Sequence, residues 1–416
     1  MDKGKAEQLL GGEFCCKCDG GKVSVEVRRG VPEQKIEEIA AALHADKAVL
    51  FVSRHFSESE RACFEAALRA AGAQPVTVSV RRRFDNALEN AGALFASAKE
   101  AEMIVVCESG LYDAAAYFAA LRNIPLVYAA FSPEADGILA PTVSVRIRDK
   151  TERICADNPR YIVIDEERLK RANRSEVAAA FASIASGIVS LIDYRVRGAL
   201  TGEFCRESYN LARGAISEAL HIGADENAPL TLLESRLVIA AVENHTRGLF
   251  SGGECAVAEL LEGSGKRRLS SAERKFAAAF LLLDLYAAYF SSPHENLLYV
   301  PDYAQRAEEL SSYIGCGKGT ILTHMLSAGA FADEEKIALY LPRLLEEIEI
   351  LRGWFGSITA KYRDLGGTDL SDQYTFGEWA RAIDRAADLP GTFSTLTLMR
   401  ESGALELLRK ELQDRN

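Results

Sequence analysis

Strand-like and helix-like segments alternate along the first 165 residues of the chain. Apolar or alternating runs predict strands at residues 22–28, 48–52, 74–80, 103–106, 124–128, 142–147 and 160–164. Apolar residues recur with a helical period at residues 31–43, 57–71, 87–98 and 113–121. Ser57 begins the second of these helices, and Glu60 follows at the spacing of a capping box. This alternation is typical of a doubly wound α/β sheet.

The pattern changes after residue 165, where strand signals almost disappear. Helical periodicity covers residues 176–195, 208–220, 230–249, 254–261, 272–290, 304–311, 334–355, 376–386 and 396–413. A chain of 416 residues is too long for a single ordinary core. We therefore predict two domains, which are a Rossmann-like α/β domain at residues 1–165 and an all-helical bundle at residues 166–416.

Composition and charge exclude several classes of function. The chain has 49 Lys and Arg against 60 Asp and Glu, and no basic stripe offsets the net charge of −11, so no nucleic acid is expected as a partner. No apolar run reaches the length of a membrane span, and the N-terminus lacks a signal-peptide core. The nine cysteines are scattered and odd in number, as in proteins that keep free thiols. We expect a cytoplasmic protein with no membrane partner.

A cluster of cysteines lies near the N-terminus, at Cys15, Cys16 and Cys18. A structural zinc ion usually needs a second pair of ligands, and no Cys-x-x-Cys or His-x-x-x-His follows. We therefore favour an unmetallated turn over a zinc knuckle. The six histidines are dispersed without metal-ligand spacing, and among them only His245, ten residues before Cys255, deserves notice.

Residues 103–141 contain a strand, an Ala-rich helix and a second strand, which together form a βαβ unit. In an open parallel sheet, the turn between strand and helix lies at the carboxyl edge, where helix N-termini bind phosphates. The turn here reads Cys107-Glu108-Ser109-Gly110. A diphosphate needs glycines at such a turn because a Cβ prevents close approach, and Glu108 would face it with like charge. The pattern strongly predicts a βαβ unit, but its turn lacks the glycines that a phosphate-binding site needs.

Several motifs together resemble those of a known family. They are Cys16-Lys-Cys18-Asp-Gly, Ala130-Phe-Ser-Pro-Glu-Ala-Asp136-Gly137, Tyr161-Ile-Val-Ile-Asp165, Asp193-Tyr-Arg195 with Thr201-Gly-Glu203, and Ser251-Gly-Gly-Glu254-Cys255. Their order and spacing resemble the sn-glycerol-1-phosphate dehydrogenase branch of the iron-containing alcohol dehydrogenase, glycerol dehydrogenase and dehydroquinate synthase superfamily. The resemblance covers nearly the whole chain. It implies a dehydroquinate synthase-like fold of two domains, with NAD(P) and a catalytic zinc or nickel ion as cofactors.

The chain departs from this family at the positions that the resemblance assigns to the dinucleotide. Vestigial cofactor-binding positions are Cys107, Glu108, Ser109, Gly110, Asp113 and Phe131. The first three stand where the family has a Gly-Gly-Gly turn, and Phe131 places a bulky ring where cofactor should lie. The family's lysine corresponds to Ala116, and the acidic residue that takes a ribose hydroxyl corresponds to Arg54.

The metal and substrate positions implied by the resemblance are also altered. The family's aspartate and two histidines correspond to Ser183, Cys255 and Ser271, and a serine hydroxyl is a poor ligand for zinc. Cys255 and Glu259 share a helix face and could hold a soft ion, although an unmetallated cysteine is the favoured interpretation. The substrate-side motif persists as Asp136 and Gly137, which an Asp-Gly turn explains equally well.

Loss of both the dinucleotide and the metal positions leads us to expect a pseudoenzyme-like protein. It would have no catalytic residues, no metal and no cofactor, and it would be kept for binding or for assembly with another subunit. Two alternatives stay open. The chain could be an active oxidoreductase that reduces a polyol phosphate ketone, such as dihydroxyacetone phosphate, with NAD(P)H and zinc or nickel through substitute residues, or a small-molecule sensor. We expect a homodimer or a hetero-oligomer.

Overall fold

The structure, a computed structural model, divides the chain into two compact units. The first comprises Met1–Val177 and Gly223–Arg247, and the second comprises Ala178–Ile222 and Gly248–Asn416. This division differs from the predicted boundary near residue 165, because residues 223–247 group with the first unit. The structure describes all residues except 1–3, 17, 19, 22, 81–86, 136, 141, 148–149, 224, 263, 267–268, 292–299, 315, 330–333, 371–372, 392, 407–409 and 411–416.

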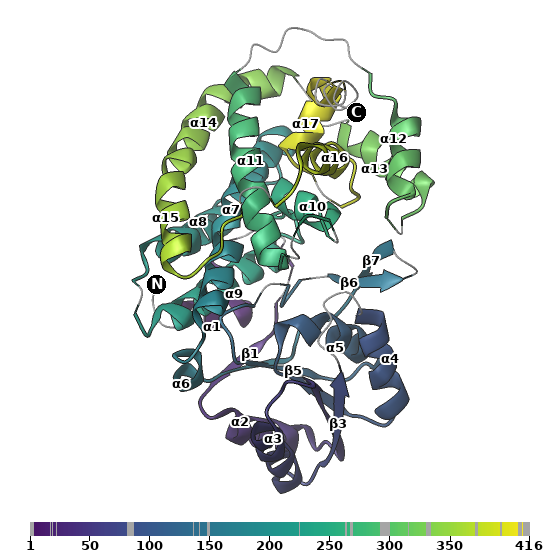
Figure 1. Cartoon of the computed structure of the whole chain (residues 1–416), viewed down its shortest axis with the longest axis vertical. Coiled ribbons are helices and arrows are strands. Elements are labelled where there is room, and N and C mark those ends of the chain that lie inside the picture. The colour runs from purple at the N-terminus through teal and green to yellow at the C-terminus, as the bar shows by residue number, and fades with distance from the viewer. Residues whose placement is uncertain are drawn as a thin grey trace. The chain divides into compact units, whose positions relative to one another are not determined.

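The first unit is built on a six-stranded parallel sheet (Figure 1). Its strands are β1 (Glu26–Arg29), β2 (Lys47–Ser53), β3 (Gln74–Val80), β4 (Met103–Val106), β5 (Leu126–Ala130) and β8 (Tyr161–Ile164). The order across the sheet is β1-β8-β5-β4-β2-β3, and every neighbouring pair is parallel. This arrangement confirms the doubly wound sheet predicted from the alternation of strands and helices.

Helices cover both faces of this sheet. They are α2 (Pro32–Leu43), α3 (Glu58–Ala70), α4 (Ala87–Ser97) and α5 (Ser109–Arg122). Figure 1 shows α2 and α3 on one face, and α4 and α5 on the other. An antiparallel hairpin of β6 (Thr142–Ile147) and β7 (Lys150–Cys155) connects β5 to β8. Alternation predicted β6, whereas β7 was missed because its sequence, Lys-Thr-Glu-Arg-Ile-Cys, is mostly polar.

One core of the first unit lies between the sheet and helices α2 and α3. Val105 of β4 and the following Cys107 both point into this core, since side chains alternate across a strand. Ile36 of α2 and Phe64 of α3 fill it from the other side, and both are fully buried. Phe131, directly after β5, packs against the same core. Cys107 and Phe131, which follow β4 and β5, therefore pack against the core.

Three further helices complete the first unit, namely α1 (Lys5–Leu10), α6 (Glu166–Leu169) and α9 (Ala228–His245). Arg29, the last residue of β1, joins them by donating hydrogen bonds to three carboxylates. They belong to Glu7 at 2.5 Å, Glu166 at 2.9 Å and Glu234 at 2.7 Å. This network explains why residues 223–247 group with the α/β unit, although their periodicity alone placed them in the helical domain.

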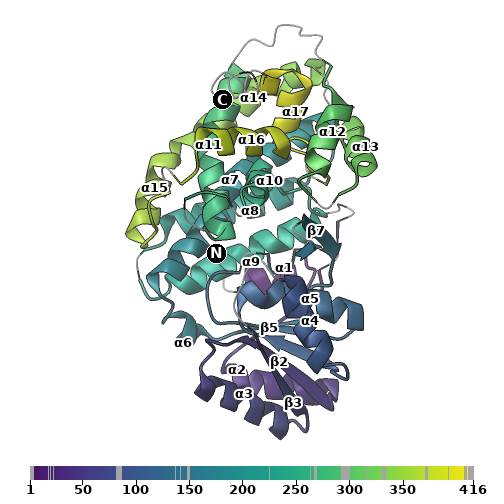
Figure 2. The same ribbon diagram turned by 45° about the vertical axis from the view of Figure 1, so that its right-hand side comes forward.

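The regular elements of the second unit, over its described residues, are all helices. Its helices are α7 (Arg174–Thr201), α8 (Arg206–His221), α10 (Gly253–Leu260), α11 (Ser271–Ser291), α12 (Tyr303–Ser311), α13 (Lys318–Gly329), α14 (Glu334–Gly353), α15 (Phe355–Asp364), α16 (Phe376–Ala386) and α17 (Thr395–Glu401). Within it, α10 packs against α11 and α16 (Figure 2). The last predicted helix, residues 396–413, is interrupted after Glu401, where Gly403 in the turn that follows has a φ of 77°. Residues 404–406 are helical again, and residues 407–409 and 411–413 lie outside the described residues.

Helix α7 is long and apolar enough to cross a membrane by length and composition. An 18-residue window within it has a mean hydropathy of 1.7. The expectation that no apolar run reaches the length of a span was therefore wrong for this helix. However, 72% of that window is buried inside the structure, as in the core helix of a globular protein.

Candidate functional site

The turn after β4 is shorter than the sequence predicted. Helix α5 begins at Ser109 with Glu108 as its N-cap, so Ser109 and Gly110 lie in the first helical turn. Only Cys107 and Glu108 remain between β4 and α5. Cys107 is 3% exposed, and its burial, with the nearby Glu108 carboxylate, raises the pKa of its thiol well above the ordinary value. The thiol of Cys107 therefore stays neutral and belongs to the core.

The Glu108 carboxylate occupies the carboxyl edge of the sheet. Its Oε2 accepts a hydrogen bond of 2.6 Å from the backbone N–H of Ser53, the last residue of β2. Strands β2 and β4 are parallel neighbours, so their carboxyl ends lie at the same edge. The carboxylate thus occupies a backbone N–H and places negative charge near the N-terminus of α5. A phosphate at this edge would be stabilised by that N–H and by the helix N-terminus if both were free. These residues do not fit a dinucleotide diphosphate.

The Phe131 ring is held by contacts with three side chains. It stacks on Phe56 with ring centroids 6.1 Å apart and an interplanar angle of 9°, and Phe64 lies 5.7 Å away. The guanidinium of Arg168 lies 3.5 Å from the centroid of Phe131, a cation–π contact. Arg168 is in turn paired with Glu60 at 2.5 Å. The Phe131 ring is therefore a structural part of this edge.

The other predicted cofactor and substrate positions differ in how far their side chains are exposed. Arg54 follows β2 with an exposed side chain, Asp113 is half-buried on α5, and Ala116 is buried on the same helix. Gly137 has a φ of 78°, as expected for a glycine in a turn. Asp136 lies outside the described residues, so its place beside a substrate stays a prediction.

The predicted metal positions lie in the second unit. Ser183 is half-buried on α7, and Ser271 begins α11 with an exposed side chain. Cys255 is half-buried in the first turn of α10, and its thiol donates to Oε1 of Glu254 at 3.7 Å. Over the part of the chain that the structure describes, no cluster of three metal-ligating side chains includes Cys255 or Glu259. A catalytic zinc or nickel ion does not fit this set, because two positions offer only a hydroxyl.

Asp193 is a buried carboxyl group close to Cys255 in the second unit. Its Oδ1 accepts hydrogen bonds from the backbone N–H and the hydroxyl of Thr395, at 2.6 and 2.7 Å. Its Oδ2 accepts from the N–H of Gly253 at 2.7 Å and from the hydroxyl of Tyr286 at 3.2 Å. Burial raises the pKa of Asp193 to about 6, and the hydrogen bonds from Thr395 and Gly253 oppose that rise.

Glu254 lies beside Asp193 and is 1% exposed. Its Oε1 accepts a hydrogen bond from the Ser190 hydroxyl, while Oε2 has no hydrogen-bond partner among the described residues. Burial raises the pKa of Glu254 to about 8, and the charge of Asp193 adds to the effect. Glu254 is therefore mostly protonated at neutral pH. Both motifs are recognisable in the sequence, but nothing in the sequence indicates that Asp193 and Glu254 lie next to each other in the fold.

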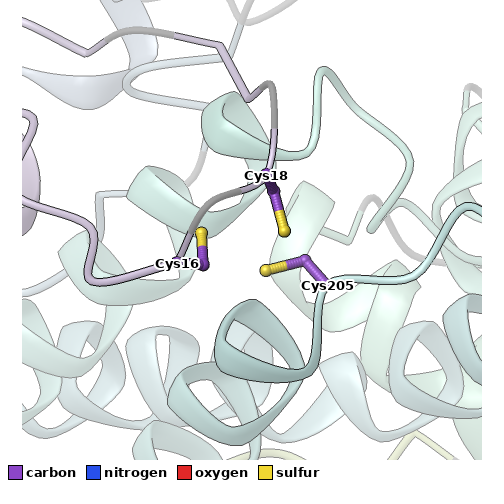
Figure 3. Close-up of side chains that lie close together, drawn as sticks. All are labelled: Cys16, Cys18 and Cys205. Carbon is purple, nitrogen blue, oxygen red and sulfur yellow. The ribbon is translucent and has the colours of Figure 1, made fainter.

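The N-terminal cysteines lie close to a histidine in the first unit. The Sγ atom of Cys16 lies 3.1 Å from Nε2 of His245, and the Sγ atoms of Cys16 and Cys18 lie within 4.8 Å of each other. Figure 3 shows the thiols of Cys16 and Cys18 on their N-terminal segment, and that of Cys205, the N-cap of α8. Sequence spacing could not reveal the contact, because 229 residues separate Cys16 from His245.

Curated proteins with similar sequences are glycerol-1-phosphate dehydrogenases [NAD(P)+]. The protein from Bacillus licheniformis is 26% identical over 201 residues, which is 45% of this chain and 50% of that protein. The protein from Bacillus velezensis is 27% identical over 259 residues, or 58% of this chain and 64% of that protein. The chain is similar in sequence to glycerol-1-phosphate dehydrogenases over part of its length. The similarity spans about half to two-thirds of these relatives, and no family model matches the chain.

Solved structures of alcohol dehydrogenases and of another oxidoreductase share the fold of this chain. A 1,3-propanediol oxidoreductase has a TM-score of 0.61 at 13% identity and covers 92% of this chain and 97% of its own. An iron-containing alcohol dehydrogenase from Thermococcus thioreducens has a TM-score of 0.60 at 11% identity and covers 94% and 98%. At such low identities the likeness shows the fold alone. It confirms the predicted fold class, a Rossmann-like α/β domain together with a helical domain.

Proposed function

We propose that this relative of glycerol-1-phosphate dehydrogenases is not itself an NAD(P)-dependent dehydrogenase, and that its fold is kept for binding or for assembly with another subunit. The observation that carries the proposal is the hydrogen bond from Ser53 N–H to the Glu108 carboxylate. A diphosphate at this edge would lose that donor and meet a fixed negative charge. The buried Cys107 thiol and the packed Phe131 ring belong to the core, so neither offers a diphosphate a polar group in place of the Ser53 N–H.

The predicted metal positions support the same proposal. Oxidation of a secondary alcohol by this class of enzyme needs a cation to stabilise the developing alkoxide. Ser183 and Ser271 contribute no charge, and Glu254 beside Cys255 keeps its proton at neutral pH. Of the three predicted metal positions, only Cys255 therefore offers a group that zinc or nickel binds well.

The test is dinucleotide binding and turnover by the purified full-length chain. Thermal unfolding is followed while NAD or NADP is titrated, and glycerol 1-phosphate oxidation is followed through NAD(P)H absorbance. The curated Bacillus subtilis glycerol-1-phosphate dehydrogenase [NAD(P)+], 27% identical over 249 residues, is the positive control. We expect no shift in the unfolding temperature and no turnover of the chain. A saturable shift with either dinucleotide, or turnover above background, would refute the proposal.

Two variants of Glu108 separate the effect of its negative charge from the effect of its hydrogen bond with the Ser53 N–H. Glu108→Gln keeps a carbonyl oxygen that can accept from Ser53 and removes only the charge, whereas Glu108→Gly also frees the Ser53 N–H. We expect dinucleotide binding to increase from wild type to Gln to Gly, with at least a tenfold gain for Gly. Equal, undetectable binding in all three proteins would show that Glu108 is not the obstacle, and the reasoning from this edge would fail.

The assembly role is supported by apolar side chains that the second unit exposes. Leu339 on α14 is 72% exposed, Leu326 on α13 is 52% exposed, and Ile350 on α14 is 45% exposed. Exposed aliphatic side chains mark a partner surface where they form one contiguous patch. Light scattering on the purified chain measures its mass. A strictly monomeric chain that also captures no second subunit from its own cell would leave the assembly role without support.

A further inference from the structure

We propose that Cys16, Cys18 and His245 bind a thiophilic metal ion such as Zn²⁺. All three side chains belong to the first unit, whereas Ser183, Cys255 and Ser271, the metal positions that the family resemblance implies, belong to the second unit. The inference is therefore separate from the question of dehydrogenase activity. It also differs from the interpretation of the cysteine segment as an unmetallated turn, because the third ligand comes from the end of α9 and not from a nearby motif.

Two of the three separations among the donor atoms can be compared with those of a zinc site, namely Cys16 to His245 and Cys16 to Cys18. Zinc–sulfur bonds of about 2.3 Å and zinc–nitrogen bonds of about 2.0 Å in a tetrahedron place sulfur and nitrogen roughly 3.5 Å apart, and two sulfurs roughly 3.8 Å apart. The Cys16 Sγ to His245 Nε2 distance is 3.1 Å, and the two cysteine sulfurs lie within 4.8 Å. Small side-chain rotations suffice to bring Cys16 and His245 to metal-bound separations.

The chain around His245 holds its imidazole in one position. His245 is 7% exposed, and Phe14 stacks on its ring with centroids 3.9 Å apart and an interplanar angle of 8°. The N–H of Gly21 donates to the His245 carbonyl at 2.9 Å. A Cβ on Gly20 would overlap the imidazole ring, so a glycine is required there. A ligand fixed in this way loses little freedom when a metal binds.

The chemistry of the three groups matches a soft or borderline cation. Two thiols and an imidazole are the donor types that zinc prefers, while calcium and magnesium require oxygen. On binding, Cys16 and Cys18 each release a proton as a metal–sulfur bond forms, and Nε2 of His245 donates its lone pair. Half-buried Cys16 and exposed Cys18 leave the fourth position open to water or to another donor.

The experiment uses untagged, reduced full-length protein freed of metal with a chelator. Co²⁺ is titrated as the probe, since thiolate-to-cobalt charge transfer reports sulfur ligation directly, and Zn²⁺ is then added as a competitor. We expect one Co²⁺ per chain, displaced by Zn²⁺. Cys16→Ser, Cys18→Ser and His245→Gln should each weaken binding at least tenfold. Cys63→Ser, which removes an exposed cysteine on α3, is the matched control and should bind as wild type does.

Two outcomes would overturn the inference. One is the absence of a charge-transfer band in the wild-type chain at stoichiometric Co²⁺. The other is a band that persists in the Cys16→Ser, Cys18→Ser double variant but disappears in Cys255→Ser, which would place the ion at the position matching the dehydrogenase metal and refute the proposed function as well. Because Cys18 is exposed and Cys16 half-buried, serine at these positions should leave unfolding of the metal-free chain unchanged, so the cysteine variants decide the test.

Discussion

The protonation of Glu254 should make the stability of this chain fall as pH rises. Burial gives Glu254 a pKa of about 8 in the folded chain, against 4.5 for a free side chain. Between these two values the unfolded chain has lost a proton that the folded chain keeps. The folded state therefore binds more protons, and the free energy of unfolding decreases with increasing pH across this window.

The size of the effect follows from the two pKa values. One pKa unit corresponds to about 1.36 kcal/mol, so full ionisation of Glu254 costs the folded chain up to about 5 kcal/mol. The part that develops between pH 5 and pH 7 is about 2 to 3 kcal/mol. Glu254→Gln removes this part, because the amide has the shape of the protonated acid, stays neutral and can still accept from the Ser190 hydroxyl.

Urea unfolding of the wild-type chain and of Glu254→Gln at pH 5 and pH 7 measures the difference. The variant should gain about 2 to 3 kcal/mol on wild type between the two pH values, while the contribution of Asp193 is common to both proteins and largely cancels. Glu259→Gln, a half-buried glutamate on the same helix, is the control and should show no comparable gain. A stability difference between wild type and Glu254→Gln that is the same at both pH values would refute the reasoning.

Two further predictions concern a buried ion pair and an aromatic contact. Arg306→Ala should lower the free energy of unfolding by roughly 3 kcal/mol, because Arg306 is 1% exposed and donates to the buried Asp388 at 2.9 Å; an unchanged urea midpoint would contradict this. Phe131→Ala should cost about 3 kcal/mol through loss of its ring contacts and should not create dinucleotide binding while Glu108 is present. Binding of NAD by the Phe131→Ala protein would show that the ring, and not the carboxylate, blocks the edge.

The sequence predicted elements best where one periodicity dominated. The bounds of β3, β4 and α16 agree with those predicted, because each has a single clear pattern between strong turn signals. Helices α13 and α15 were missed, as were the short α1 and α6. Helix α5 was predicted four residues too short at its start, because Ser109 and Gly110 are typical of turns and here begin a helix instead.

The candidate sites depended on contacts that periodicity cannot reveal. Glu108 was recognised as a poor phosphate neighbour, but its bond to Ser53 joins residues 55 positions apart. The contact of Cys16 with His245 and the burial of Glu254 beside Asp193 are likewise products of tertiary packing. A single sequence lists the chemical groups, and only the fold decides which of them meet.

The Arg29 network has a consequence for how this chain is made. The first unit receives α9 only after residues 178–222, which belong to the second unit, have been synthesised. Until Glu234 emerges, Arg29 has two of its three carboxylate partners. A nascent chain that ends near Val177, where the first segment of this unit ends, would therefore hold an incomplete α/β unit. The two units should then reach their native states in overlapping rather than successive stages of translation.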